Sequence, residues 1–156
     1  MQRYKILLIV AATVALLDQL TKVIIIHYLP LHHSIHIVSG FFDITHIRNR
    51  GTAFGMFRDG SVFLFLFLIA VSIAALAVIF LIYRKVENNQ WYRLALSLIV
   101  GGAVGNLIDR IRLGEVIDFL DVYIGQYHWP AFNVADSAIT IGVFLAVLSF
   151  KEGKGS

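Results

Sequence analysis

Four long apolar stretches dominate the hydrophobic pattern of this chain, with polar segments between them. A helix needs about 20 predominantly apolar residues to cross the hydrocarbon core of a membrane, and each stretch is long enough or nearly so. The pattern therefore predicts one integral membrane domain over residues 1–156, with transmembrane helices at about residues 5–29, 61–83, 91–108 and 132–150.

The longer segments between these helices, residues 30–60 and 109–131, carry patterns of their own. Apolar and polar residues alternate on either side of Ser39-Gly40, which predicts two short strands joined by a turn. The sequence GTAFGMF (51–57) then has the composition of a short amphipathic piece at the membrane interface. The second segment holds aromatic residues of types that settle at the level of the lipid headgroups: Tyr123, Tyr127 and Trp129.

The composition supports a membrane protein, because 58% of the residues are hydrophobic and only 15% are charged. Soluble domains average about 25% charged residues, so an ordinary soluble domain is excluded. The absence of cysteine excludes a disulfide framework and a thiol nucleophile. The net charge of +3 is small and the basic residues are scattered, so no nucleic-acid-binding patch is predicted. None of the six histidines lies in an HExxH motif, and no metal site is expected.

The basic residues also indicate the orientation in the membrane, because they are enriched near the cytoplasmic ends of transmembrane helices. With both termini in the cytoplasm, seven basic residues lie inside and five outside, and the seven lie close to helix ends. We therefore expect cytoplasmic termini and four spans. The seven are Arg3, Lys5, Arg84, Lys85, Arg93, Lys151 and Lys154.

Under this topology, polar side chains from four separate segments lie at one level, near the outer leaflet. Asp18 and Lys22 are four residues apart on one helix face and fit a neutralising ion pair. Gly101 and Gly105 have the GxxxG spacing of closely packed membrane helices. Residues at the end of the third helix either terminate it or contribute to a site: Asn106, Asp109 and Arg110. The other polar residues at this level are Gln19, Asn49, Arg50 and Asn133.

Two carboxylates are harder to explain by packing, because Asp118 (in VIDFL) and Asp136 (in NVADSAI) have no adjacent cation. A carboxylate well inside a membrane costs roughly 2.5–3.5 kcal/mol on insertion scales, so such a group is expected to be protonated or functional. Two carboxylates brought together share a proton. In an aspartyl protease, the ionised member activates water while the protonated member donates to the scissile carbonyl oxygen. Asp121, three residues beyond Asp118, is expected to be a solvated loop carboxylate.

Five blocks, in order along essentially the whole chain, resemble the lipoprotein signal peptidases, also called signal peptidase II. They are LDQLTK (17–22), NRGTAF (49–54), GGAVGNLIDR (101–110), GEVIDF (114–119) and FNVADSAI (132–139). The resemblance implies an all-α membrane protein with four transmembrane helices, a small extracytoplasmic β-sheet cradle and a short interfacial helix. It also implies that Asp118 and Asp136 are catalytic. The residues that it implies for substrate binding or support are Asp18, Lys22, Asn49, Gly51, Asn106, Asp109, Arg110, Asn133 and Ala135.

The resemblance further implies the reaction, which is removal of the signal peptide from bacterial prolipoproteins just before a diacylglyceryl-modified cysteine. The expected partners are this lipidated prolipoprotein, membrane lipids and globomycin-type inhibitors, with no cofactor and no nucleic acid. The expected enzyme is a monomer in the bacterial cytoplasmic (inner) membrane, with its active site toward the outer leaflet. The second position of the NRG block is variable in the family, so Arg50 receives no role from the resemblance.

The residues alone leave two other functions open. Intramembrane carboxylates also serve proton and ion pathways, so the chain is alternatively a subunit of such a pathway. The second predicted helix argues against this reading, because its only polar side chains are Ser61, Ser72 and Tyr83. A non-catalytic membrane adaptor, held together by ion pairs of the aspartates, is the other alternative.

Overall fold

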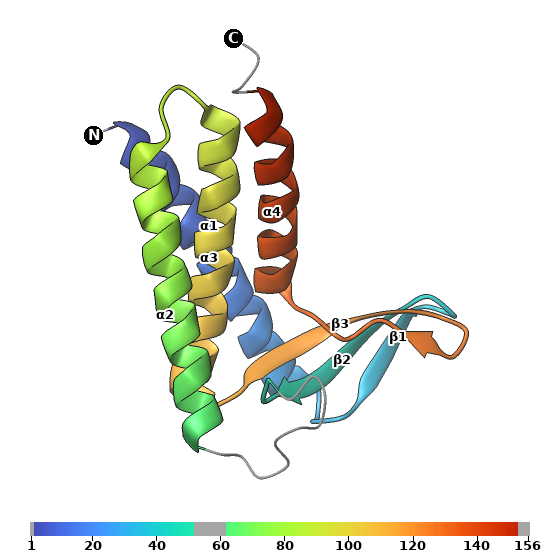
Figure 1. Cartoon of the computed structure of the whole chain (residues 1–156). Coiled ribbons are helices and arrows are strands. Elements are labelled where there is room, and N and C mark those ends of the chain that lie inside the picture. Colours follow the sequence, from blue (N-terminus) through green and yellow to red (C-terminus); the bar gives the residue numbers. More distant parts are fainter. Residues whose placement is uncertain (1, 52–61, 153–156) are drawn as a thin grey trace.

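The computed structural model describes residues 2–51 and 62–152 of the chain. Figure 1 shows a bundle of helices with a sheet attached at one end. Within the described residues, the helices are α1 (Gln2–Tyr28), α2 (Val62–Lys85), α3 (Gln90–Leu113) and α4 (Val134–Glu152). The strands are β1 (Ser34–Val38), β2 (Phe42–Asn49), β3 (Val116–Ile124) and β4 (Tyr127–His128).

In the part of the chain that the structure describes, three helices are long and apolar enough to cross a membrane, namely Tyr4–Tyr28 within α1, the whole of α2 and the whole of α3. No part of the most apolar window of α2 is buried inside the protein, as expected for a helix whose apolar surface contacts lipid. The apolar part of α4, Val134–Ser149, is shorter. Three of the four predicted spans are therefore helices of sufficient length and hydropathy, and the fourth span stays a prediction.

The central helix of the bundle is α3, which packs against each of the other three helices. The side chain of Asn89 caps its first turn by accepting a hydrogen bond from the Tyr92 N–H at 2.8 Å. Gly114 ends the helix with a φ of 76°, a left-handed conformation that favours glycine. Because the turn at Gly114 is tight, the chain passes directly from α3 into β3.

Glycines of α3 allow the neighbouring helices to approach closely, as the sequence predicted. A Cβ atom added at Gly102 would overlap the carbonyl oxygen of Ala135 in α4. A Cβ atom added at Gly105 would lie 2.6 Å from Oδ2 of Asp18 in α1. These close approaches bring the backbones of α1, α3 and α4 together at the level of the polar residues.

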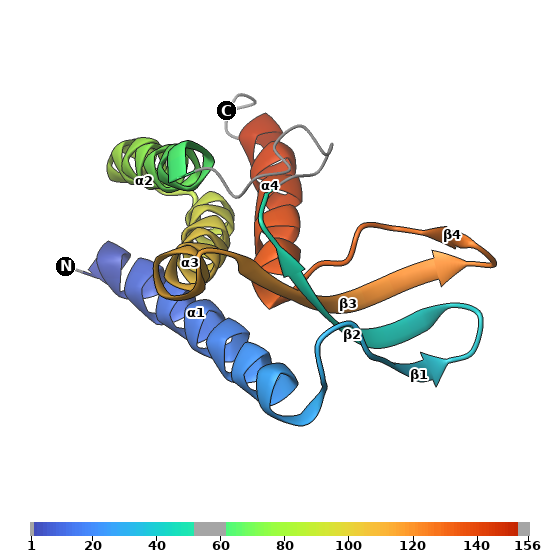
Figure 2. The same cartoon turned by 90° about the horizontal axis from the view of Figure 1, so that it is seen from below.

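The sheet is antiparallel, with the strand order β1-β2-β3-β4. Strands β1 and β2 form the predicted pair, and Gly40 in the turn between them has a φ of 77°. Figure 2 shows the sheet extending sideways from the bundle, away from α2. After β4 the chain returns through Phe132, which bridges to Leu120 of β3, and then enters α4. Strand β3 and the start of α4 are therefore held side by side.

The third predicted helix ends later than expected. We predicted an end at residue 108, whereas α3 continues to Leu113. The polar residues in this last stretch do not terminate the helix, because Asp109 points inward, is 2% exposed and pairs with Lys22.

Strands β3 and β4 were not predicted from the residues, which indicated only the pair around Ser39-Gly40. Asp121 lies on β3 and not in a loop, and both of its carboxylate oxygens are within hydrogen-bond distance of His128 Nδ1. The expectation of a solvated loop carboxylate was therefore wrong. Most of the predicted amphipathic piece at residues 51–57 lies outside the described residues.

Candidate active site

Asp118, the first of the two predicted catalytic aspartates, lies near the start of β3 and is 2% exposed. Asn49 of β2 donates from Nδ2 to Asp118 Oδ2 at 2.9 Å. Asn133, just before α4, donates from Nδ2 to Asp118 Oδ1 at 2.8 Å. The register pairs Asn49 with Val116, two residues before Asp118 and on the same face of the sheet. Each carboxylate oxygen therefore accepts a hydrogen bond from an amide, which favours the ionised form.

Asp136, the second predicted aspartate, lies in the first turn of α4. Asn106 of α3 donates from Nδ2 to Asp136 Oδ1 at 2.7 Å. Asn133 caps the helix, because its Oδ1 accepts a hydrogen bond from the Asp136 N–H at 2.9 Å. Asn133 Nδ2 is also 3.2 Å from Asn106 Oδ1. A continuous chain of side-chain hydrogen bonds through the two asparagines therefore links Asp118 to Asp136.

Burial raises the pKa of Asp118 from its ordinary value of 3.8 to about 6, and the negative charge of Asp136 acts in the same direction. The hydrogen bonds from Asn49 and Asn133 and the positive charge of Lys22 lower the pKa of Asp118 and only partly offset these effects. Asp136 is therefore close enough to bias the ionisation of Asp118. A carboxyl group that titrates near neutral pH is suited to general acid–base chemistry.

A buried ion cluster supports this pair from the side of α1. Lys22 Nζ lies 2.8 Å from Asp18 Oδ2, 2.8 Å from Asp109 Oδ2 and 3.1 Å from Asn106 Oδ1. The predicted pair of Asp18 and Lys22 is confirmed, and Asp109 joins it. Asp18 Oδ1 also accepts a hydrogen bond from the Ala135 N–H at 2.9 Å. The cluster therefore holds Asn106, which donates to Asp136, and the first turn of α4, which carries Asp136.

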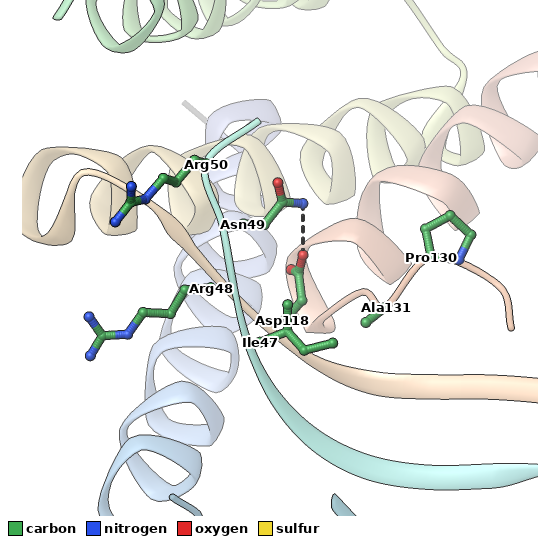
Figure 3. Close-up of a pocket in the computed structure, with 7 residues that line it drawn as sticks. All are labelled: Ile47, Arg48, Asn49, Arg50, Asp118, Pro130 and Ala131. Carbon is green, nitrogen blue, oxygen red and sulfur yellow. Dashed lines mark hydrogen bonds between the residues drawn. The ribbon is translucent and has the colours of Figure 1, made fainter. Parts of the chain in front are cut away.

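A pocket of about 270 Å³ opens beside Asp118. Figure 3 shows Asn49 and Asp118 facing one another at its centre, with Pro130 and Ala131 across from them. The pocket offers space for a substrate segment next to one of the two aspartates. Its lining residues are Ile47, Arg48, Asn49, Arg50, Asp118, Pro130 and Ala131.

Comparison with known proteins identifies the family of this chain. A family model described as signal peptidase (SPase) II matches residues 10–151. This chain belongs to the signal peptidase II family. The lipoprotein signal peptidase of Geobacter sulfurreducens is 53% identical over 151 residues, which cover 96% of this chain and 94% of that protein. The lipoprotein signal peptidase of Syntrophotalea carbinolica is 49% identical over 150 residues, which cover 94% of this chain and 91% of that protein.

The fold of this signal peptidase II is also similar to that of a solved structure. A bacterial membrane enzyme, whose structure was determined by the in meso method at 1.9 Å resolution, superposes with a TM-score of 0.84. It is 34% identical in sequence, and the match covers 96% of this chain and 94% of that one. The similarity therefore extends over both the helices and the sheet.

Two further residues predicted for the signal peptidase II site lie around the aspartates. The Gly51 N–H donates to Asn49 Oδ1 at 2.8 Å, which leaves Asn49 Nδ2 directed at Asp118. Arg110 donates to the carbonyl oxygen of Asn106 at 3.3 Å and lies within electrostatic reach of both aspartates. The fold thus gathers the predicted supporting residues about one pair of carboxyl groups.

Two further residues of this region received no role from the sequence, although Gln19 was expected at this level of the membrane. Gln19 Nε2 donates to Asp109 Oδ1 at 2.8 Å and to the carbonyl oxygen of Gly105 at 3.2 Å, so it ties α1 to α3. Glu115 binds two arginines at the edge of the pocket. Their positions inside the LDQLTK and GEVIDF blocks were the available signal, but a sequence does not show which side chains of a block face the site.

Proposed function

We propose that this signal peptidase II removes the signal peptide from diacylglyceryl-modified prolipoproteins by cleaving the peptide bond just before the lipidated cysteine. Asp118 and Asp136 act together as an aspartyl protease pair. The observation that carries this proposal is the link between the two carboxyl groups through Asn106 and Asn133, beside a pocket that reaches Asp118.

The proposed chemistry needs one ionised and one protonated carboxyl group. The ionised aspartate accepts a proton from a water molecule, whose oxygen then attacks the scissile carbonyl carbon. The protonated aspartate donates its proton to the carbonyl oxygen, so that a neutral tetrahedral intermediate forms. As the C–N bond breaks, the aspartate that took the proton from water passes it to the leaving amine of the cysteine. The other aspartate takes back a proton from a hydroxyl of the intermediate as the carbonyl re-forms, which restores the pair. No cofactor or metal takes part in these steps.

The neighbouring residues hold this pair in place in the proposed mechanism. Asn49 and Asn133 fix both oxygens of Asp118, and Asn106 fixes Asp136. Arg110 supplies a positive charge near both aspartates. All of these groups come from one chain, so we propose that the enzyme acts as a monomer.

The arrangement in space supports the proposed topology. Figure 1 shows the N-terminal end of α1 and the C-terminal end of α4 at one end of the bundle and the sheet at the other. With both termini in the cytoplasm and α4 as the fourth span, the aspartates face the outer leaflet of the bacterial cytoplasmic membrane. A lipidated substrate remains anchored in that leaflet, so its cleavage site reaches the pair without extraction of the lipid.

The experiment that tests this function uses the purified protein in lipid vesicles with two substrates. One is a prolipoprotein carrying the diacylglyceryl group, and the other is the same prolipoprotein without it. We expect cleavage of the lipidated form only, just before the cysteine, with inhibition by globomycin. Cleavage at another bond, or equal cleavage of both forms, would contradict the proposal. Proton flux in protein-loaded vesicles without cleavage would instead support the proton-pathway alternative, which family membership does not favour.

A further inference from the structure

Glu115 is a buried carboxylate that has no part in the proposed catalytic mechanism. It follows Gly114 directly, at the junction of α3 and β3, and is only 7% exposed. Arg48 Nη1 lies 2.9 Å from Glu115 Oε1, and Arg50 Nε lies 3.1 Å from Glu115 Oε2. Because each oxygen binds a different arginine, this one side chain joins Arg48 of β2 and Arg50, which directly follows β2, to the start of β3.

The two arginines flank Asn49, the residue that donates to Asp118. Figure 3 shows the side chains of Arg48 and Arg50 extending to one side of β2, while the side chain of Asn49 turns toward Asp118 on the other. The arginines remain partly solvated, with 42% and 65% of their side chains exposed, whereas the carboxylate between them is buried. The buried Glu115 carboxylate is therefore the more rigid partner, and it restrains the two arginine side chains.

The end of β2 depends on few other contacts among the described residues. Strand β1 pairs with β2 only between Phe42 and Thr45, so the last residues of β2 have β3 as their strand partner. The final pair in the register is Asn49 with Val116, and strand ends fray when nothing else holds them. The contacts of Glu115 lie on both sides of this final pair.

We propose that Glu115 is a positioning residue whose ion pairs with Arg48 and Arg50 hold the end of β2, so that Asn49 stays hydrogen-bonded to Asp118. This inference rests on the proposed function and assigns a further residue to its site. Glu115 does not touch the substrate or the reacting atoms. It acts through Asn49.

Asn49 is one of several groups that set the ionisation of Asp118. Burial and the charge of Asp136 on α4 raise the pKa of Asp118, whereas Lys22 on α1 lowers it. Arg110 on α3 is a further charge within reach. Among the groups that lower this pKa, the hydrogen bond from Asn49 has the largest effect. Loss of Glu115 should therefore loosen Asn49 and raise the pKa of Asp118.

The test compares kcat/KM against pH for the wild type, Glu115→Gln and the control Glu87→Gln, with lipidated prolipoprotein as substrate. Glu87 is an exposed glutamate in the α2–α3 connection. The pH profile of kcat/KM should have an inflection near pH 6 that reports the pKa of Asp118. For Glu115→Gln we expect this inflection to move to higher pH, whether Asp118 acts in its ionised or protonated form. We also expect kcat/KM at the optimum to fall by about tenfold to about a hundredfold, the size of effect that displaced catalytic groups produce. Glu87→Gln should match the wild type.

A second background separates positioning from a general loss of stability. In Asn49→Ala, no amide remains to be positioned, so adding Glu115→Gln should leave the inflection where Asn49→Ala alone puts it. An unmoved inflection in the single variant Glu115→Gln, with cleavage intact, would overturn the inference. If Glu115→Gln does not fold, the substitute variant is Arg50→Gln, which removes only the more exposed of the two arginine partners. An unmoved inflection in the pH profile of Arg50→Gln would also overturn the inference. Failure of the wild type to cleave the substrate would count against the proposed function instead.

Discussion

Lys22 is a buried lysine whose ammonium group neutralises two carboxylates of the site. Its side chain is 2% exposed, and its three N–H donors have three acceptors at 2.8, 2.8 and 3.1 Å, in Asp18, Asp109 and Asn106. We predict that Lys22→Met destabilises the protein far more than the loss of an exposed lysine does. Methionine fills a similar volume but leaves two buried carboxylates without their counterion.

The size of the effect follows from the contacts that remain. In Lys22→Met, Asp18 still accepts from the Ala135 N–H at 2.9 Å, and Asp109 still accepts from Gln19 at 2.8 Å. These neutral donors do not replace a full positive charge. Breaking a buried ion pair by removing one partner costs about 3–5 kcal/mol, a large part of the roughly 5–15 kcal/mol by which domains are stable.

The assay is reversible unfolding in detergent, followed by circular dichroism, for Lys22→Met and for Lys85→Met as a control. Lys85 is exposed at the end of α2, and its replacement should cost less than about 0.5 kcal/mol. In a double-mutant cycle, Asp109→Asn should cost less in the Lys22→Met background than in the wild type, with a coupling of about 2 kcal/mol. If Lys22→Met costs no more than the roughly 1 kcal/mol typical of a surface ion pair, the argument from burial is wrong.

Two further predictions concern the aspartates and the helix packing. Burial raises the pKa of Asp118 to about 6, so the folded protein holds this proton more tightly than the unfolded chain does. The contribution of Asp118 to the free energy of unfolding is therefore complete below about pH 4, and ~3 kcal/mol of it is lost as the pH rises through 6. Asp118→Asn should abolish this dependence when unfolding is compared at acidic and neutral pH. Gly102→Ala would push against Ala135, and Gly142→Ala against the carbonyl oxygen of Ala95 at 2.7 Å, farther along the same two helices. Each should cost about 1–3 kcal/mol, but only Gly102→Ala should lower the cleavage rate of the folded protein; an equal loss of rate in both would refute the local explanation.

Much of this fold is visible in the pattern of the sequence, because the membrane imposes long uninterrupted apolar helices. The α2 helix is the clearest case, since nothing in it interrupts the apolar run. The end of α3 was placed five residues too early, because Asp109 and Arg110 look like the polar residues that end a membrane helix. Only the three-dimensional structure shows that Asp109 is neutralised by Lys22, 87 positions earlier in the chain.

The two aspartates were identified from their apolar surroundings and from the resemblance, but their connection was not. Asn133 is an example, because an asparagine before a helix predicts a cap, and nothing in the sequence shows that the same side chain also donates to Asp118. Strand β3 was missed for a similar reason. Its run of apolar and acidic residues becomes a strand through its pairing with β2, a contact between residues about 70 positions apart.

The measurement that tests the central claim most directly is cleavage of a lipidated prolipoprotein by Asp118→Asn and Asp136→Asn, each compared with Asp121→Asn. Asp121 lies on the same strand as Asp118 but binds His128 and takes no part in the proposed site. All three variants should remain folded in detergent, as judged by gel filtration and circular dichroism. We predict no detectable cleavage by the first two and near wild-type cleavage by Asp121→Asn. Retained cleavage by a folded Asp118→Asn or Asp136→Asn would contradict the two-aspartate mechanism.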